Sequence, residues 1–274
     1  MAKSSPVLND LLAVLDEIAA PTLAESWDNV GLMVGDPGQD VRGVMVALDS
    51  SEEILAEAES NGCNVVVTHH PLIFKPLTAV RTDQVVGRLL ARAMASKIAV
   101  ISCHTNLDKV PGGVNDALAA SLNLQDCRVL AVDQVGEDEV GFGRIGNLGS
   151  NMTFAEFVEL LLTALDLPAV RVAGVVPGQL SSVAVCGGSG SELAEVAMEA
   201  GAQVFITGEV KHSTARWAEE AGFCVIDAGH FSTEKLVVPT LVAAIGKGCG
   251  DRGLDVPVYG TKFQSSPFKN YFRK

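Results

Sequence analysis

The chain has 274 residues, 48% of them hydrophobic and 19% charged, which can fill the core of one large domain or two ordinary α/β domains. A net charge of −13 disfavours nucleic acid as a partner, because a duplex-binding surface needs a basic face to neutralise phosphates. No uncharged apolar stretch is long enough for a membrane span, and the N-terminal residues lack the basic and apolar regions of a signal peptide. We therefore expect neither.

The six cysteines contain no Cys-x-x-Cys pair. Most lie in or beside apolar runs, which is typical of small buried thiols. Cys103 has an alternative role as a metal ligand, because it stands beside His104. Buried free thiols and the expected absence of a signal peptide predict a reducing, cytoplasmic environment.

The first half of the chain alternates helical and strand-like patterns. The expected elements in chain order are a helix over 6–19, a turn and short strand over 27–35, a strand over 41–49, a helix over 51–60, a strand over 64–68, a helix over 83–96, a strand over 98–102 and a helix over 114–122.

The second half repeats the alternation. It is expected to contain strands over 142–148, 170–173, 183–186, 203–207 and 223–226, and helices over 154–165, 192–200, 212–221 and 233–245.

Continuous apolar strands that alternate with helices predict an α/β fold, with largely parallel sheets covered on both faces, that is, three layers. The acidic, glycine-containing stretch 136–149 is the expected boundary between two units. They would cover residues 1–135 and 136–274, with the C-terminal part packing back on the first unit.

The histidines fall where predicted strands end. Ligands of parallel sheets bind at the carboxyl ends of the strands, so side chains there can meet although they are distant in sequence. The histidines that closely follow predicted strands are His69, His70, His104 and His230.

Carboxylates accompany two of these histidines, since Asp108 comes four residues after His104 and Glu234 four residues after His230. If a helix starts near His230, His230 and Glu234 share one face. Mixed imidazole and carboxylate ligands predict a metal site and suit zinc, iron, manganese or nickel without choosing among them.

Other polar and aromatic residues leave two interpretations open. The segment Gly187–Ser191 could bind phosphate through its N–H groups or form a plain tight turn. Lys75 and Lys211 could add positive charge near a phosphate or be surface lysines. Trp27 could stack on a base or belong to a core or an interface, and His212 could contact substrate or be a surface residue.

The motifs together resemble the Nif-three-like dinuclear metal-centre family, which includes GTP cyclohydrolase 1 type 2 homologues. The resemblance covers nearly the whole chain and rests on Trp27–Gly31, Leu48-Asp49, Thr68–Phe74, His104–Asp108, Gly187–Gly190, Thr207–Glu209 and Asp227–Glu234.

The resemblance implies two interlocked α/β units, a ring-shaped homohexamer and a centre of two divalent metal ions that faces the inside of the ring. It implies that Glu234 bridges the metals and that His104 lies beside them as a ligand or proton carrier. The implied metal ligands are His69, His70, Asp108, His230 and Glu234.

Two metal ions can activate water and clamp a reacting group, and five ligands leave positions open for both. We therefore expect a metal-dependent hydrolase of a nucleotide or phosphoester, with His104 moving protons. The GTP cyclohydrolase reaction follows from the resemblance alone. The alternative is a non-catalytic metal-binding ring protein with a regulatory or interaction role, although open coordination positions argue against purely structural metals.

Overall fold

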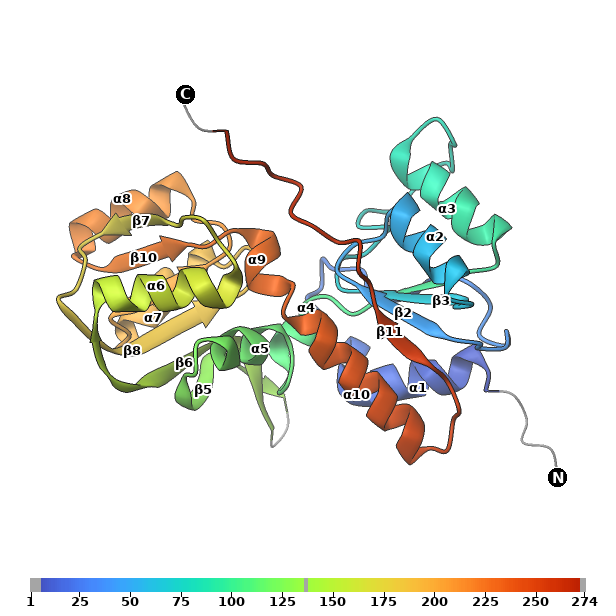
Figure 1. Ribbon diagram of the computed structural model, residues 1–274, viewed down its shortest axis with the longest axis horizontal. Helices are drawn as coiled ribbons and strands as arrows, with labels where there is room; N and C mark the ends of the chain where they lie inside the picture. The colour runs from blue at the N-terminus through green and yellow to red at the C-terminus, as the bar shows by residue number, and fades with distance from the viewer. Residues whose placement is uncertain (1–5, 136–137, 272–274) are drawn as a thin grey trace. The chain divides into compact units, whose positions relative to one another are not determined.

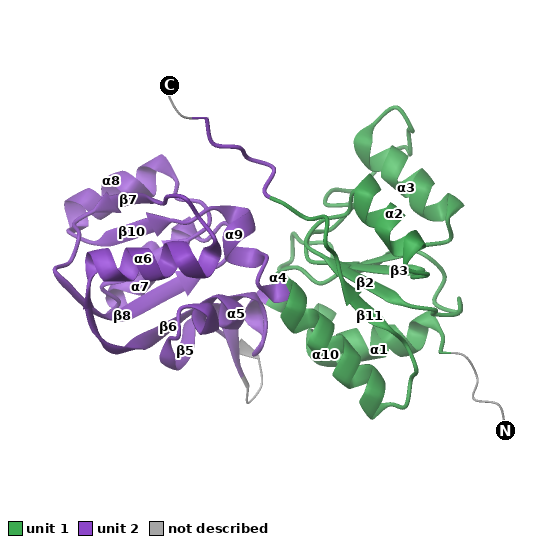
Figure 2. Cartoon of the chain, viewed as in Figure 1, with its two compact units in different colours: residues 1–107, 238–265 green, residues 108–237, 266–274 purple. Residues whose placement is uncertain are grey.

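The structure is a computed structural model that describes residues 6–135 and 138–271 (Figure 1). The chain divides into two compact units (Figure 2). Unit 1 comprises residues 1–107 and 238–265, and unit 2 comprises residues 108–237 and 266–274. The chain therefore passes from one unit to the other more than once.

Unit 1 contains a five-stranded sheet in the order β1-β4-β3-β2-β11. Only β1 is antiparallel to its neighbour, and the other pairings are parallel. The strands β2, β3 and β4 are buried along their whole length, as their continuous valine-rich sequences predict. The bounds are β1 (Gly31–Val34), β2 (Val44–Ala47), β3 (Val65–Thr68), β4 (Ala99–Ser102) and β11 (Val258–Gly260).

Helices cover both faces of this sheet, α2 and α3 on one and α1 and α10 on the other (Figure 1). The first face is built from β-strand residues such as Met45 and Val66, which pack against Leu55 and Leu89 of the helices. The bounds are α1 (Leu8–Ile18), η1 (Pro21–Leu23), α2 (Glu52–Ser60), α3 (Val85–Ala95) and α10 (Val237–Asp251), and a short helix α4 (Thr105–Lys109) crosses the unit boundary.

Unit 2 contains a six-stranded mixed sheet in the order β5-β6-β8-β9-β10-β7. The pairs β8-β9 and β9-β10 are parallel and the others are antiparallel. The bounds are β5 (Gln125–Val135), β6 (Asp138–Thr153), β7 (Arg171–Gly174), β8 (Gln179–Cys186), β9 (Val204–Thr207) and β10 (Cys224–Asp227).

The helices of unit 2 also form two layers around their sheet. One core cluster joins α5 and α6 to the strands through residues such as Leu118 and Phe157, and a second joins α7 and α8 through Ala197 and Ala218. The bounds are α5 (Val114–Ser121), α6 (Phe154–Leu165), η2 (Ser191–Leu193), α7 (Ala194–Glu199), α8 (His212–Ala221) and α9 (His230–Glu234).

Local signals explain where several helices begin. The Ser51 hydroxyl accepts a hydrogen bond from the N–H of Ile54 at the start of α2. At the start of α6, Thr153 and Glu156 form a reciprocal capping box.

The predicted α/β class is confirmed, with two sheets and helices on both of their faces. The first sheet is largely parallel. In the second sheet only β8, β9 and β10 run parallel to one another, and β5 and β6 form a long antiparallel pair. The sequence indicated only the part of this pair near 142–148, and it did not indicate β11, whose three residues carry almost no local signal.

The expected division at 135/136 touches residue 136, which lies outside the described residues. The strands on either side of it, β5 and β6, pair with each other inside unit 2. Residues 238–265 belong to unit 1, so the C-terminal part of the chain returns to the first unit.

Two details of the last helices differ from the prediction. The expected helix 233–245 is two helices, α9 and α10, and α10 continues through three glycines to Asp251.

Within the described parts of the chain, no helix combines the length and the apolar character that crossing a membrane requires.

Candidate metal centre

Two parallel strands deliver the histidines of unit 1. His69 and His70 follow β3, and His104 follows β4. These strands pair in parallel with Thr68 opposite Ser102, so they end at the same edge of the sheet. The convergence expected from the sequence is confirmed for these three side chains.

The three imidazole rings lie next to one another. The ring centroid of His69 is 4.9 Å from that of His70 and 5.1 Å from that of His104, and the His70–His104 distance is 5.6 Å. Each ring offers a nitrogen within 4.8 Å of those of the other two. His69 is completely buried, and the other two are half-buried.

Each of these rings is held at Nδ1 by an acceptor. His69 Nδ1 lies 2.9 Å from the carbonyl oxygen of Cys103, and His70 Nδ1 lies 2.9 Å from Oδ1 of Asp49. His104 Nδ1 lies 2.8 Å from Oδ1 of Asp28.

A carbonyl or a carboxylate can only accept a hydrogen bond, so Nδ1 of each ring carries a hydrogen, and in a neutral ring Nε2 then carries the lone pair. Metal-ligating histidines are oriented in this way, with one nitrogen anchored and the other directed at the ion. The geometry therefore fits a metal ion held by imidazole nitrogens of unit 1.

Asp28 is the most enclosed of the anchoring carboxylates, since its side chain is 0% exposed. Burial alone would raise its pKa, but hydrogen bonds from His104 and from both the hydroxyl and N–H of Thr105 outweigh burial and hold the pKa well below its usual range. The group is thus a fixed anion behind His104.

Unit 2 contributes a second cluster at the ends of β9 and β10. His230 begins α9, and its Nδ1 lies 2.9 Å from Oε1 of Glu209, which follows β9. Its Nε2 lies 3.1 Å from Oε2 of the buried Glu234, one helical turn later. The prediction that His230 and Glu234 share a face is confirmed.

This pair also fits a cation. If Nδ1 of His230 donates to Glu209, its Nε2 lone pair faces a carboxylate oxygen of Glu234. Two acceptors at this distance repel each other unless a proton or a metal ion lies between them. An imidazole nitrogen and a carboxylate oxygen suit a divalent transition metal.

Asp108 lies in α4, and the N–H₂ of Asn115 donates to its carbonyl. Burial raises the pKa of the Cys186 thiol in the same unit, and the negative charges of Asp108, Glu192 and Glu234 raise it further.

The glycine segment Gly187–Ser191 packs against this cluster. The N–H groups of Gly187, Gly188 and Gly190 donate to Asn115, Thr233 and Thr207 respectively. Because these N–H groups are already used, the structure favours the tight-turn interpretation over a phosphate-binding loop.

Gly188 is required by its surroundings. Its φ is +63°, and a Cβ atom there would lie 2.2 Å from Oε1 of Glu234 and 3.4 Å from Nε2 of His230. The segment therefore lies so close to the carboxylate of Glu234 that a side chain at this position would have to displace it.

The sequence did not assign a role to the anchoring carboxylates Asp28, Asp49 and Glu209, although two of them follow β2 and β9 as the histidines follow β3 and β4. A polar side chain shortly after a buried strand was the criterion for the histidines, and it applies equally to Asp49 and Glu209. Burial raises the pKa of the Cys103 thiol to about 12, and the carbonyl oxygen of Cys103 anchors His69.

The other candidate residues lie at the surface. Lys75 is exposed, Lys211 pairs with Glu192 at 3.7 Å, and His212 is exposed at the start of α8. Trp27 is 59% exposed, so it does not belong to the core of its unit.

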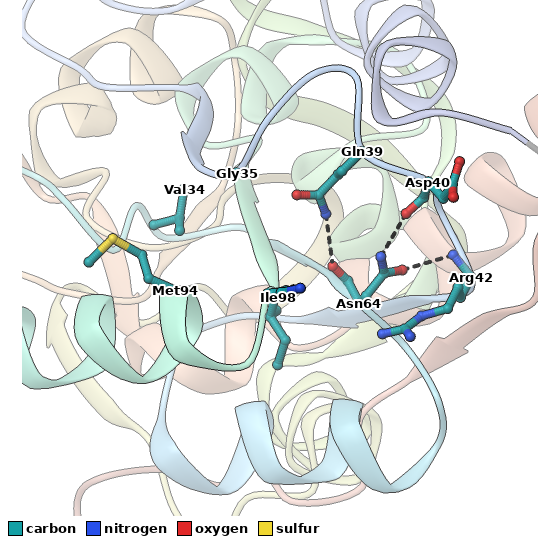
Figure 3. Close-up of a pocket in the computed structure, with 9 residues that line it drawn as sticks. Val34, Gly35, Gln39, Asp40, Arg42, Asn64, Met94 and Ile98 are labelled. Carbon is teal, nitrogen blue, oxygen red and sulfur yellow. Dashed lines mark hydrogen bonds between the residues drawn. The ribbon is translucent and has the colours of Figure 1, made fainter.

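A cavity of about 550 Å³ lies at the other edge of the first sheet, near the residues that precede β3 and β4 (Figure 3). It is lined by Val34, Gln39, Arg42, Asn64 and Ile98 among others, and Asn64 ties the surrounding loop by accepting from the N–H of Arg42 and donating to the carbonyl of Asp40. None of the candidate ligands lines it.

The fold and the site define a class of protein: a two-unit α/β protein with histidines and a glutamate that could hold metal ions. The family described as Duf34/NIF3 (NGG1p interacting factor 3) matches residues 6–267, and the chain belongs to this family.

Named relatives and solved structures support this family membership. A "GTP cyclohydrolase 1 type 2 homolog" from Clostridium acetobutylicum is 32% identical over 262 residues, which cover 96% of this chain and 98% of the relative. A Staphylococcus aureus hypothetical protein of known structure is 29% identical with a TM-score of 0.92, over 98% of this chain and 100% of that chain. A Bacillus cereus protein related to NIF3 is 25% identical with the same TM-score and the same coverage.

Proposed function

We propose that this protein is a hydrolase of a nucleotide or phosphoester that depends on a dinuclear metal centre. The observation that supports the proposal is the anchoring of four imidazoles at Nδ1, which fixes the orientation of each ring as in histidines that bind metal ions. The proposed ligands are His69, His70, Asp108, His230 and Glu234.

The helix α4 begins directly after His104 and contains Asp108, so these two candidate residues are close together in the chain. Glu234, with two carboxylate oxygens and a buried position, is the proposed bridging ligand.

When bound, two divalent cations would polarise a substrate oxygen and make water a stronger nucleophile. His104 is the proposed general base, which accepts a proton at Nε2 and returns it to the leaving group. Asp28 stabilises the charged imidazole that forms, because it remains an anion on the opposite nitrogen.

A nucleotide substrate is supported by the names of the relatives, and GTP is therefore the first substrate to test. We further propose a cytoplasmic location and a homohexamer. The location is supported by the cysteines, all of which are free thiols.

The test combines metal content with turnover. Purified protein, prepared without chelator, should contain about two metal ions per chain and should turn over GTP or a simple phosphodiester. His69→Ala and Glu234→Ala should each lose metal and most of the activity. His212→Ala is the matched control, because this histidine is exposed on α8 outside the cluster, and it should behave as the wild type.

Activity that survives both ligand substitutions would reject the metal-dependent mechanism. Metal-loaded protein that turns over no nucleotide or phosphodiester in a broad panel would instead favour the non-catalytic, regulatory alternative.

A further inference from the structure

We propose that Trp27 and Phe74 form a platform on which the base of a nucleotide stacks beside His104. This inference rests on the proposed nucleotide hydrolase and names the part of the substrate that unit 1 recognises. The platform consists of these two side chains only.

Both rings of the platform are exposed. Trp27 is 59% and Phe74 is 46% exposed, in a chain that has only 5% aromatic residues. Large aromatic faces left in water next to polar side chains are typical of binding sites rather than of cores.

The platform lies beside His104 of the histidine cluster. The ring centroid of His104 is 6.3 Å from that of Trp27 and 6.2 Å from that of Phe74, and both contacts are edge-on. Trp27 and Phe74 are 6.0 Å apart and tilted by 53°. A flat ring placed on Trp27 would thus lie next to the imidazole that we propose as the base.

Hydrogen bonds fix the backbone that carries the platform. Asp28, the neighbour of Trp27, accepts from His104 and Thr105. The side-chain amide of Asn29 donates to the carbonyl oxygen of Ile73 at 2.5 Å. This hydrogen bond joins the segment that contains Trp27 to the residue before Phe74. The platform and His104 therefore form one connected piece of unit 1.

The chemistry of the platform selects a class of ligand. Each nucleic-acid base has a flat π face that stacks on indole or phenyl, and such stacking tolerates any base. A phosphate or a sugar alone has no such face. The predicted ligand is therefore a nucleotide held by its base here, with its remainder toward the histidines.

The chain offers a direct optical test, because Trp27 and Trp217 are its only tryptophans. Trp217→Phe leaves Trp27 as the single reporter, and Trp27→Phe leaves Trp217, which packs against Phe223 in unit 2. Guanosine monophosphate is titrated into each protein as purified, with excitation where guanine does not absorb. Saturable quenching is expected in Trp217→Phe and not in Trp27→Phe.

Affinity is then measured by calorimetry with the same probe. Trp27→Leu should weaken binding about tenfold or more, since one base stack contributes roughly that factor. Trp27→Phe, which keeps an aromatic face, should lose less. Ribose 5-phosphate, which lacks a base, should bind the wild type and Trp27→Leu equally.

Absence of quenching in Trp217→Phe, or an unchanged affinity in Trp27→Leu, would overturn the inference. So would a change in oligomeric state on Trp27→Leu together with no quenching, which would assign the platform to a subunit interface. Turnover without quenching leaves the hydrolase proposal intact while this inference fails. Quenching without turnover supports the base site while the hydrolase proposal fails.

Discussion

Asp28 shows how one buried carboxylate can serve both the fold and the site. It accepts three hydrogen bonds, from His104, from the N–H of Thr105 and from the Thr105 hydroxyl. An amide in its place would direct an N–H₂ group toward donors and would leave at least one of them unsatisfied.

We therefore predict that Asp28→Asn lowers the free energy of unfolding by about 1–3 kcal/mol at neutral pH. Because the pKa of Asp28 is lower in the folded protein, its contribution is fully present above the ordinary value and is lost as the pH falls through the folded value. Denaturant titrations of both proteins should show a clear difference at neutral pH, which shrinks as the pH falls below the ordinary pKa of an aspartate.

The control is Asp83→Asn, since Asp83 is exposed and paired with Arg81. It should change stability by less than about 1 kcal/mol. A loss as large as that of Asp28→Asn would show that the hydrogen bonds around His104 are not the cause.

Gly188 allows backbone strain to be separated from an effect on the metal cluster. An added Cβ would have to displace the buried carboxylate of Glu234, and the φ of +63° is unfavourable for alanine. Gly62 has a similar φ of +72°, but nothing lies within 4 Å of its added Cβ.

We predict that Gly188→Ala and Gly62→Ala both lose about 1–2 kcal/mol of stability from the left-handed conformation. Only Gly188→Ala should also bind less metal, measured by elemental analysis after equilibrium dialysis. Equal metal content in the two variants would contradict the proposed role of Glu234 as a ligand.

At the scale of elements, the glycines of α10 have opposite roles although they lie in one helix. A Cβ at Gly248 would lie 2.6 Å from Cγ1 of Val14 in α1, whereas nothing lies within 4 Å at Gly246. Val14 is fully buried and β-branched, so it cannot easily move aside. The close approach of α1 and α10 therefore depends on one of the glycines.

Alanine substitutions should consequently have opposite signs. Gly246→Ala should stabilise the protein by about 0.5–1 kcal/mol, because alanine favours the helix. Gly248→Ala should destabilise it, since overpacking costs about 1–3 kcal/mol and exceeds this gain. Thermal unfolding of the two variants measures the difference, and equal melting temperatures would contradict the packing of α1 against α10.

At the scale of the whole molecule, the exposure of the cysteine thiols indicates how well the core of each unit is shielded from solvent. Cys127 is exposed, and the other five cysteines are buried. Burial raises the pKa of Cys63 and Cys224 to about 11, so their thiols remain protonated and slow to react near neutral pH.

A thiol reagent should therefore modify one cysteine quickly in the native protein and all six only after unfolding in denaturant. Cys127→Ser should abolish the fast phase, and Cys63→Ser should leave it unchanged. Two or more fast thiols in the native wild type would contradict the burial of the cores.

The sequence alone was sufficient for most helices, the buried strands and the histidines at their ends. These features depend on local patterns: apolar periodicity, capping residues and a polar side chain directly after an apolar run. His69, His70 and His104 were placed together because parallel neighbouring strands end at the same edge. His230 and Glu234 are the first and last residues of the helix α9, so their spacing of four residues places them on one face, which is again a local pattern.

Only the tertiary structure decided which acceptor anchors each histidine. Asp28 and His104 are 76 residues apart, and no local pattern links a turn near the N-terminus to the end of β4. The same holds for β11, which joins β2 after most of the chain has intervened, and for Gly188, whose lack of a side chain leaves room for the carboxylate of Glu234. Local patterns determine what a segment becomes, while contacts between distant segments depend on packing that no short window of sequence contains.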